Sequence, residues 1–154
     1  MSKPDYVYVT YIETTADKLW NALTSSEFTE RFWFGYRATS DWKVGSPHCF
    51  VKNGSRAVQG EVLIADPPSK LAYSWDVVKE GHVREQVSRV TFDIEPFGSV
   101  VKLTVTHDNL GPNTLRDISG GWPMVIASLK SFLETGRELP ADLLTSGARE
   151  AYHA

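Results

Sequence analysis

The strongest constraint in this sequence is a two-residue alternation of apolar and polar side chains, which runs from about residue 36 to residue 107. The alternating apolar positions fall into three clear runs: Leu71, Tyr73, Trp75 and Val77; Val90, Phe92 and Ile94; and Val101, Leu103 and Val105. Successive side chains of a strand point to opposite faces, so each run predicts a strand with one apolar face. Turn signals separate the strands, and the clearest is Asn53-Gly54, since a type I′ turn needs positive φ at both central positions. The sequence therefore predicts an antiparallel meander with one wet face.

Shorter signals precede this alternating run. Residues 5–13 are rich in β-branched and aromatic side chains and contain no Gly or Pro, which predicts an opening strand. A capping pattern in residues 14–17 begins a short helix with one apolar face. Ser25 and Ser26 begin a second short helix, which we expect to end at Gly35.

A long helix is the last strong signal. Its apolar stripe recurs at helical spacing through Trp122, Ile126, Leu129 and Leu133. Proline is tolerated in the first turn of a helix, so Pro123 predicts that the helix begins at Gly120-Gly121-Trp122, after a polar connection over residues 109–119. Gly136 is a natural residue to follow its end.

These elements predict an α+β fold, with a curved antiparallel sheet of about six to seven strands wrapped around the long C-terminal helix. Sheet twist makes the apolar face concave, and only the last helix is long enough to cover it. We expect a single domain over residues 1–138, followed by a C-terminal tail or short helix over residues 139–154.

Composition narrows the possible functions. The chain has 154 residues and a net charge of −3, with no block of like charges, so we expect no nucleic-acid partner. No apolar run approaches the ~20 residues that a membrane span needs, so we expect no membrane insertion. Cys49 is the one cysteine, and the start of the chain lacks the apolar segment of a signal peptide, so we expect a cytoplasmic protein.

Several short motifs together resemble the bacterial branch of the domain named after the activator of Hsp90 ATPase, within the START and Bet v 1-like helix-grip superfamily (SRPBCC). The segments that carry the resemblance are residues 11–23, 40–45, 60–63, 66–68, 71–75 and 120–136. The resemblance implies the helix-grip fold and a cavity between the sheet and the long helix. The eukaryotic co-chaperone is similar to this chain only in its C-terminal domain, so we do not expect Hsp90 as a partner.

Aromatic residues are abundant enough to line such a cavity. Ligand pockets are mostly hydrophobic with a few polar groups that fix orientation, whereas the alternative for the same residues is plain core packing. The predicted ligand contacts are Trp42, Phe50, Tyr73, Trp75, Phe92, His107, Trp122 and Ile126. The predicted partner is therefore a small hydrophobic molecule.

Two residues are candidates for acid–base chemistry. His107 is in phase with the apolar positions of its strand, and histidine is suited to proton transfer near neutral pH. The alternatives are a hydrogen-bonding role in the pocket and a merely structural or exposed histidine. Glu61 is the second candidate, while most other carboxylates fall on the opposite, solvated face. We expect no metal site, because His48 and Cys49 are adjacent and diverge on a strand. We expect no cofactor, since no P-loop or dinucleotide fingerprint is present.

Three functions remain open from the sequence. The first is binding of a small hydrophobic or aromatic ligand between the sheet and the C-terminal helix. The second is a cavity enzyme of the cyclase or hydrolase type that uses His107 as acid or base. The third is an interaction module, either a stress-related co-chaperone or a homodimer built on a sheet edge or on Leu143-Leu144.

Overall fold

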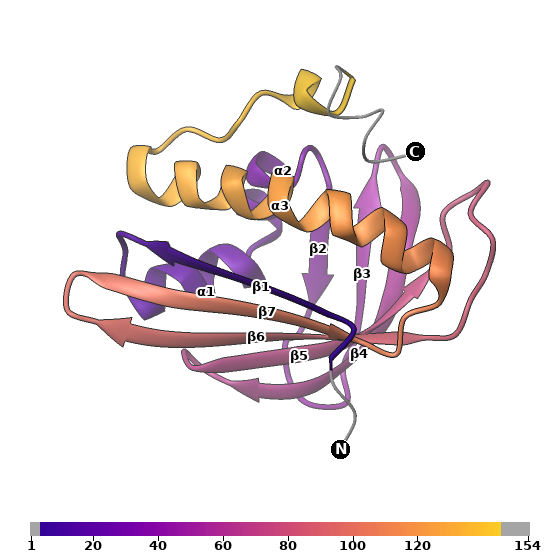
Figure 1. Ribbon diagram of the computed structural model, residues 1–154, viewed down its shortest axis with the longest axis horizontal. Helices are drawn as coiled ribbons and strands as arrows, with labels where there is room; N and C mark the ends of the chain where they lie inside the picture. The colour runs from indigo at the N-terminus through magenta and orange to yellow at the C-terminus, as the bar shows by residue number, and fades with distance from the viewer. Residues whose placement is uncertain (1–3, 146–154) are drawn as a thin grey trace.

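The computed structural model describes residues 4–145 and has a curved antiparallel sheet with one long helix lying across it (Figure 1). The strands are β1 (Tyr6–Ile12), β2 (Arg37–Ser40), β3 (Pro47–Lys52), β4 (Ser55–Asp66), β5 (Lys70–Val77), β6 (Ser88–Phe97) and β7 (Val100–Asp108). The helices are α1 (Ala16–Thr24), α2 (Ser26–Phe32), α3 (Pro112–Thr135) and the short 3-10 helix η1 (Ala141–Thr145). The predicted α+β helix-grip fold, with two short helices after the first strand, is confirmed.

The seven strands follow the order β1-β7-β6-β5-β4-β3-β2, and every neighbouring pair is antiparallel. The helices α1 and α2 carry the chain from β1 at one edge of the sheet to β2 at the other. Asn53 and Gly54 both have positive φ, 53° and 78°, in the turn between β3 and β4. The hairpin predicted at these two residues is therefore confirmed.

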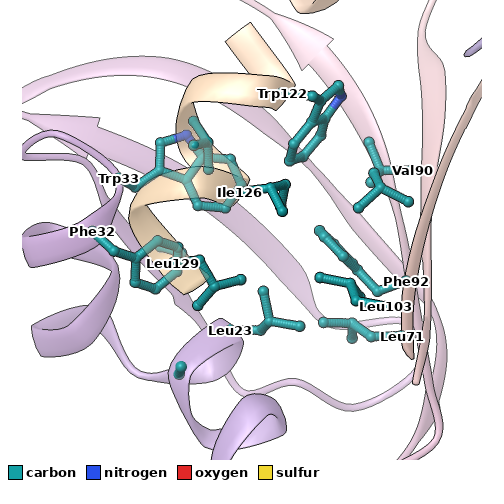
Figure 2. Close-up of a cluster of buried hydrophobic side chains, with 14 of the residues drawn as sticks. Leu23, Phe32, Trp33, Leu71, Val90, Phe92, Leu103, Trp122, Ile126 and Leu129 are labelled. Carbon is teal, nitrogen blue, oxygen red and sulfur yellow. The ribbon is translucent and has the colours of Figure 1, made fainter. Parts of the chain in front are cut away.

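The concave face of the sheet and one face of α3 form the core. Figure 2 shows side chains from α1, α2, the sheet and α3 meeting there. The labelled core residues are Leu23, Phe32, Trp33, Leu71, Val90, Phe92, Leu103, Trp122, Ile126 and Leu129, and all of them are buried. Burial of a large apolar side chain contributes about 1.5–3 kcal/mol, so this layer supplies most of the stability of the fold.

The start of the long helix was predicted wrongly. α3 begins at Pro112 rather than at Gly120-Gly121-Trp122, and Pro123 lies inside it. The segment expected to be a polar connection therefore forms the first turns of the helix. Pro112 is tolerated at the start because its missing N–H would have no partner there. Pro123 costs the helix one main-chain hydrogen bond, and packing of Ile118 and Trp122 before it and Ile126 after it keeps the helix continuous.

The segment after α3 lies on the side of that helix away from the sheet (Figure 1). The Leu139 N–H donates to Ser128 Oγ at 3.1 Å, and Arg31 donates to the Gly136 carbonyl at 3.1 Å. Leu139 and Leu143 are partly buried against the core. Residues 146–154 of the predicted tail lie outside the described part of the chain.

A close approach between β4 and β5 explains one glycine. A Cβ at Gly60 would lie 2.2 Å from the Ser74 carbonyl oxygen and 2.7 Å from His48 Nε2. The absence of a side chain allows the buried His48 ring to reach Ser74, where Nε2–H donates to the carbonyl at 2.6 Å. Burial lowers the pKa of His48, although the hydrogen bond to Ser74 partly opposes this effect.

We predict that Gly60→Ala destabilises the protein by about 2–3 kcal/mol, because the new methyl group overlaps a main-chain oxygen and separates His48 from Ser74. Urea denaturation followed by circular dichroism measures the change. Gln59→Ala, at the neighbouring position, is the control and should change stability by less than about 1 kcal/mol. Equal stability of Gly60→Ala and the wild type would contradict this account of the close approach.

Candidate functional site

A cavity of about 430 Å³ lies between the N-terminal half of α3, the strands β3 to β5 and the loop of residues 78–87. The buried apolar residues that line it, the cavity floor, are Trp33, Phe50, Ala57, Val58, Trp75 and Ile118. Its exposed lining residues, the cavity rim, are Lys79, Glu80, Gly81, Val83 and Arg116. The volume lies within the range of small-molecule pockets, and an apolar floor with a polar rim is their usual composition.

Three aromatic rings give the cavity floor its shape. Phe50 packs against Trp33 and Trp75, with centroid distances of 4.6 and 5.4 Å. The two indole rings lie 6.4 Å apart at an interplanar angle of 24°. Trp33 comes from the end of α2 and Trp75 from β5, so elements far apart in the sequence build one aromatic surface.

The loop of residues 78–87 is attached to the first turn of α3 by Glu85. Its carboxylate accepts hydrogen bonds from the N–H groups of Thr114 and Asn113, at 2.8 and 3.2 Å, and from the Thr114 hydroxyl at 2.8 Å. Gly111, the residue before the helix, offers no side chain of its own as a cap, and a Cβ there would lie 2.5 Å from the Glu85 carboxyl carbon. Glu85 therefore supplies the N-cap of α3 from 28 residues away in sequence.

Charge and hydrogen bonding at this contact favour the ionised carboxylate. Desolvation alone would raise the pKa of Glu85, but the hydrogen bonds from Thr114 and Asn113 outweigh it and the net pKa is lowered. His82 extends the contact, because its Nδ1 lies 3.4 Å from Asp117 Oδ2 and its Nε2 lies 3.4 Å from Thr114 Oγ1. One wall of the cavity is thus a loop held to the helix by polar contacts.

The predicted ligand contacts divide into two groups. Phe50 and Trp75 line the cavity. Tyr73, Phe92, Trp122 and Ile126 are buried in the core beside it, and Trp42 is half-buried against Tyr73 at a centroid distance of 6.1 Å. The cavity lies nearer the start of α3 than the sequence stripe suggested.

Several cavity residues were not found from the sequence, and the main ones are Trp33, Tyr36, Ala57, Val58, His82, Thr114 and Ile118. For two of these residues, Thr114 and Ile118, the sequence does contain a pattern that places them on the helix. Gly111-Pro112 is a helix-start pattern, and Thr114 and Ile118 continue the Trp122 stripe backward at four-residue spacing. The loop residues have no local pattern that indicates a cavity.

His107 points inward, as its strand phase predicted, and is fully buried. The Trp122 Nε1–H donates to His107 Nδ1 at 3.1 Å. Because an indole can only donate, Nδ1 is the acceptor, and the proton of the neutral ring lies on Nε2. The Nε2–H donates to Ser88 Oγ at 2.8 Å, and the Ser88 hydroxyl donates to the Trp75 carbonyl at 3.2 Å. Both ring nitrogens are therefore occupied, and His107 is not among the residues that line the cavity.

The second acid–base candidate, Glu61, is exposed and also lies outside the cavity lining. A catalytic role for either residue stays a prediction, and this geometry does not favour it.

Within residues 4–145 no group of three or more His, Cys, Asp or Glu side chains is arranged to hold a metal ion. None of the helices in this range is both long and apolar enough to cross a bilayer.

A curved sheet that grips a long C-terminal helix defines a protein of the helix-grip fold. The sequence model for Activator of Hsp90 ATPase homolog 1-like protein matches residues 13–134, and the chain belongs to this family. The comparison with curated protein sequences found no match.

Solved structures agree with this fold. Protein MLL2253 from Mesorhizobium loti is 25% identical, with a TM-score of 0.69 over 83% of this chain and 96% of that one. CalU16 from Micromonospora echinospora is 23% identical, with a TM-score of 0.70 over 95% and 82% of the two chains. The Aha1 dimer from Colwellia psychrerythraea is 20% identical, with a TM-score of 0.69 over 84% and 96%.

Burial lowers the pKa of His107 to about 3, although the charge of Asp5 opposes this effect. The unfolded chain therefore binds a proton at His107 below about pH 6.5 that the folded protein binds only near pH 3. Stability is fully present above pH 6.5 and decreases as the pH falls toward 3. Between pH 7 and pH 5 we predict that His107 alone lowers the free energy of unfolding by about 2 kcal/mol.

Urea denaturation of the wild type and His107→Gln at both pH values checks this prediction. The variant should lose less stability than the wild type on acidification, whatever its stability at pH 7. His48 remains in both proteins, so the difference between them isolates His107. Parallel pH profiles for the two proteins would show that His107 is not held neutral by burial.

Proposed function

We propose that this protein binds a small hydrophobic or aromatic molecule in the cavity between α3, the sheet and the loop of residues 78–87. The observation that carries the proposal is a volume of about 430 Å³ above the aromatic floor formed by Trp33, Phe50 and Trp75. A floor of this kind gains apolar contact area when a ring is placed on it. The charged rim supplies polar groups that can orient a ligand.

The family and its neighbours support this proposal at the level of fold. DynU16, described as a putative protein in the dynemicin biosynthetic locus, is 18% identical, with a TM-score of 0.71 over 86% of this chain and 48% of that one. Activation of Hsp90, which the family description names, is not part of the proposal. No specific observation favours the cyclase or hydrolase alternative, since both nitrogens of His107 are occupied.

The test uses the neutral fluorescent probe N-phenyl-1-naphthylamine. We expect saturable binding with a rise in probe fluorescence, and a gain of about 2.7 kcal/mol in stability at 100 times the Kd. Ala57→Leu places a larger side chain in the cavity floor and should weaken binding about tenfold while the protein stays folded. Ala127→Leu, on an exposed position of α3, is the matched control and should bind as the wild type does. Equal affinity of the Ala57 variant and the wild type would place the probe elsewhere.

A homodimer through β1 is a second candidate function. β1 is an edge strand, and its outer face exposes Val7, Val9 and Tyr11, with exposed fractions of 49%, 45% and 53%. Lys130 donates to the Tyr11 carbonyl and Glu134 accepts from the Glu13 N–H, so α3 occupies the last part of this edge. In an antiparallel strand every second residue directs its N–H and C=O to the same side. The main-chain groups of Val9 and Val7 therefore face the open edge, as those of Tyr11 do. An apolar edge of this kind is suited to pairing with a second copy.

For this candidate we expect a dimer mass by light scattering after gel filtration, and a monomer mass for Val9→Lys, because a charged side chain blocks edge-to-edge pairing. Val44→Lys changes another exposed valine, 66% accessible, in the connection between β2 and β3, and should remain dimeric. A monomeric wild type at high concentration, or a dimeric Val9→Lys, would remove the candidate.

A further inference from the structure

Two indole N–H groups of the cavity floor have no acceptor in the described part of the protein. Trp122 donates to His107, but no hydrogen bond joins the indole nitrogen of Trp33 or Trp75 to any residue in 4–145. Both side chains are buried, with exposed fractions of 8% each. A buried N–H that finds no partner in the protein is costly, so these two donors need an explanation.

The location of the two indole nitrogens supplies this explanation. The described residues contain two side-chain polar atoms that are sealed from solvent without a hydrogen-bond partner, Thr14 Oγ1 and His48 Nδ1. Neither indole nitrogen is sealed in this way, so each N–H reaches open space. Both residues line the cavity, which supports placing the open space beside each N–H in the cavity. In Figure 2 the indole nitrogen of Trp33 lies on the side of the ring turned away from Leu23 and Leu129, in agreement with this placement.

The hydrogen-bonding character of the floor follows from the chemistry of indole. An indole N–H donates and cannot accept, so the floor offers two donors that demand an acceptor. The carboxylates that line the cavity belong to Glu80, which is exposed, and Asp117, which is half-buried and faces His82. The carboxylates therefore lie toward the outside of the cavity, and the two indole donors belong to the floor.

We propose that the ligand is a planar aromatic compound with a carbonyl oxygen, whose rings pack on the cavity floor and whose oxygen accepts hydrogen bonds from the indole N–H groups of Trp33 and Trp75. This inference rests on the proposed ligand-binding function and adds the chemical class. A carbonyl oxygen has two lone pairs and no proton, which matches two N–H groups that can only donate. A hydrocarbon of the same shape leaves both donors unpaired, and such sites discriminate strongly against ligands that lack the polar group.

The test compares 9-fluorenone with fluorene, which has the same tricyclic frame but carries no acceptor oxygen. We expect fluorenone to bind about tenfold more tightly than fluorene, the result of two hydrogen bonds of ordinary net strength. In ¹H–¹⁵N spectra, fluorenone should move two of the five indole resonances downfield, and fluorene should not. The resonance of Trp122 is an internal control, because its N–H is already bound to His107.

Trp33→Phe and Trp75→Phe keep an aromatic ring and remove one N–H each. Each should remove one of the shifted resonances and reduce the preference for fluorenone over fluorene about threefold. Trp42→Phe, outside the cavity lining, should leave the preference unchanged. Because every variant is scored by the ratio of two affinities, a change in cavity size that affects both ligands equally does not alter the result.

The outcomes separate this inference from the proposed function. Equal binding of the two tricyclic compounds, or a preference that survives both tryptophan substitutions, overturns the inference and leaves the ligand-binding function intact. No binding of fluorenone, fluorene or N-phenyl-1-naphthylamine overturns both. A preference for fluorenone that is lost in Trp33→Phe and Trp75→Phe and kept in Trp42→Phe supports both.

Discussion

A buried chain of hydrogen bonds, from Trp122 through His107 and Ser88 to the Trp75 carbonyl, fixes α3 against the three neighbouring strands β5, β6 and β7. Apolar packing gives the sheet and the helix affinity for each other but does not by itself fix their register. Each member of this chain has its partner, which is the condition under which a buried polar network stabilises a single arrangement. The direction of the chain also requires a neutral His107, so the geometry is tied to one protonation state.

The same chain explains why the cavity lies where it does. It joins Trp122, near the middle of α3, to the centre of the sheet, and toward the C-terminal end of α3 the core is closed by Ile126, Leu129 and Phe132 against α1 and α2. Toward the N-terminal end of α3 the cavity lies between the helix and strands β3 to β5, and the loop of residues 78–87 forms one of its walls. Polar contacts from Glu85 and His82 hold this loop, whereas apolar packing closes the other end. A wall held by a few polar contacts can open at lower cost than a packed core.

The sequence predicted the elements whose signals are local. Strand alternation gave β5 to β7, Asn53-Gly54 gave the hairpin, and the inward direction of His107 followed from its phase with Val105. The start of α3 is not predicted correctly, because Pro123 indicates a first turn although it lies inside the helix. The contact that caps the helix comes from Glu85, which no local pattern connects with Pro112.

The sequence predicts the residues that line the cavity less well than the strands, and for a different physical reason. Periodicity tells which face of a strand is apolar, and it placed Tyr73, Trp75 and Phe92 on one face correctly. It does not tell where packing on that face is incomplete, because that depends on the distance between helix and sheet at each position. Trp75 and Tyr73 are two residues apart on β5, yet one lines the cavity and the other is packed in the core. The difference is set by what lies opposite each residue: Ile118 and the 78–87 loop share the cavity with Trp75, whereas Phe92 and His48 surround Tyr73.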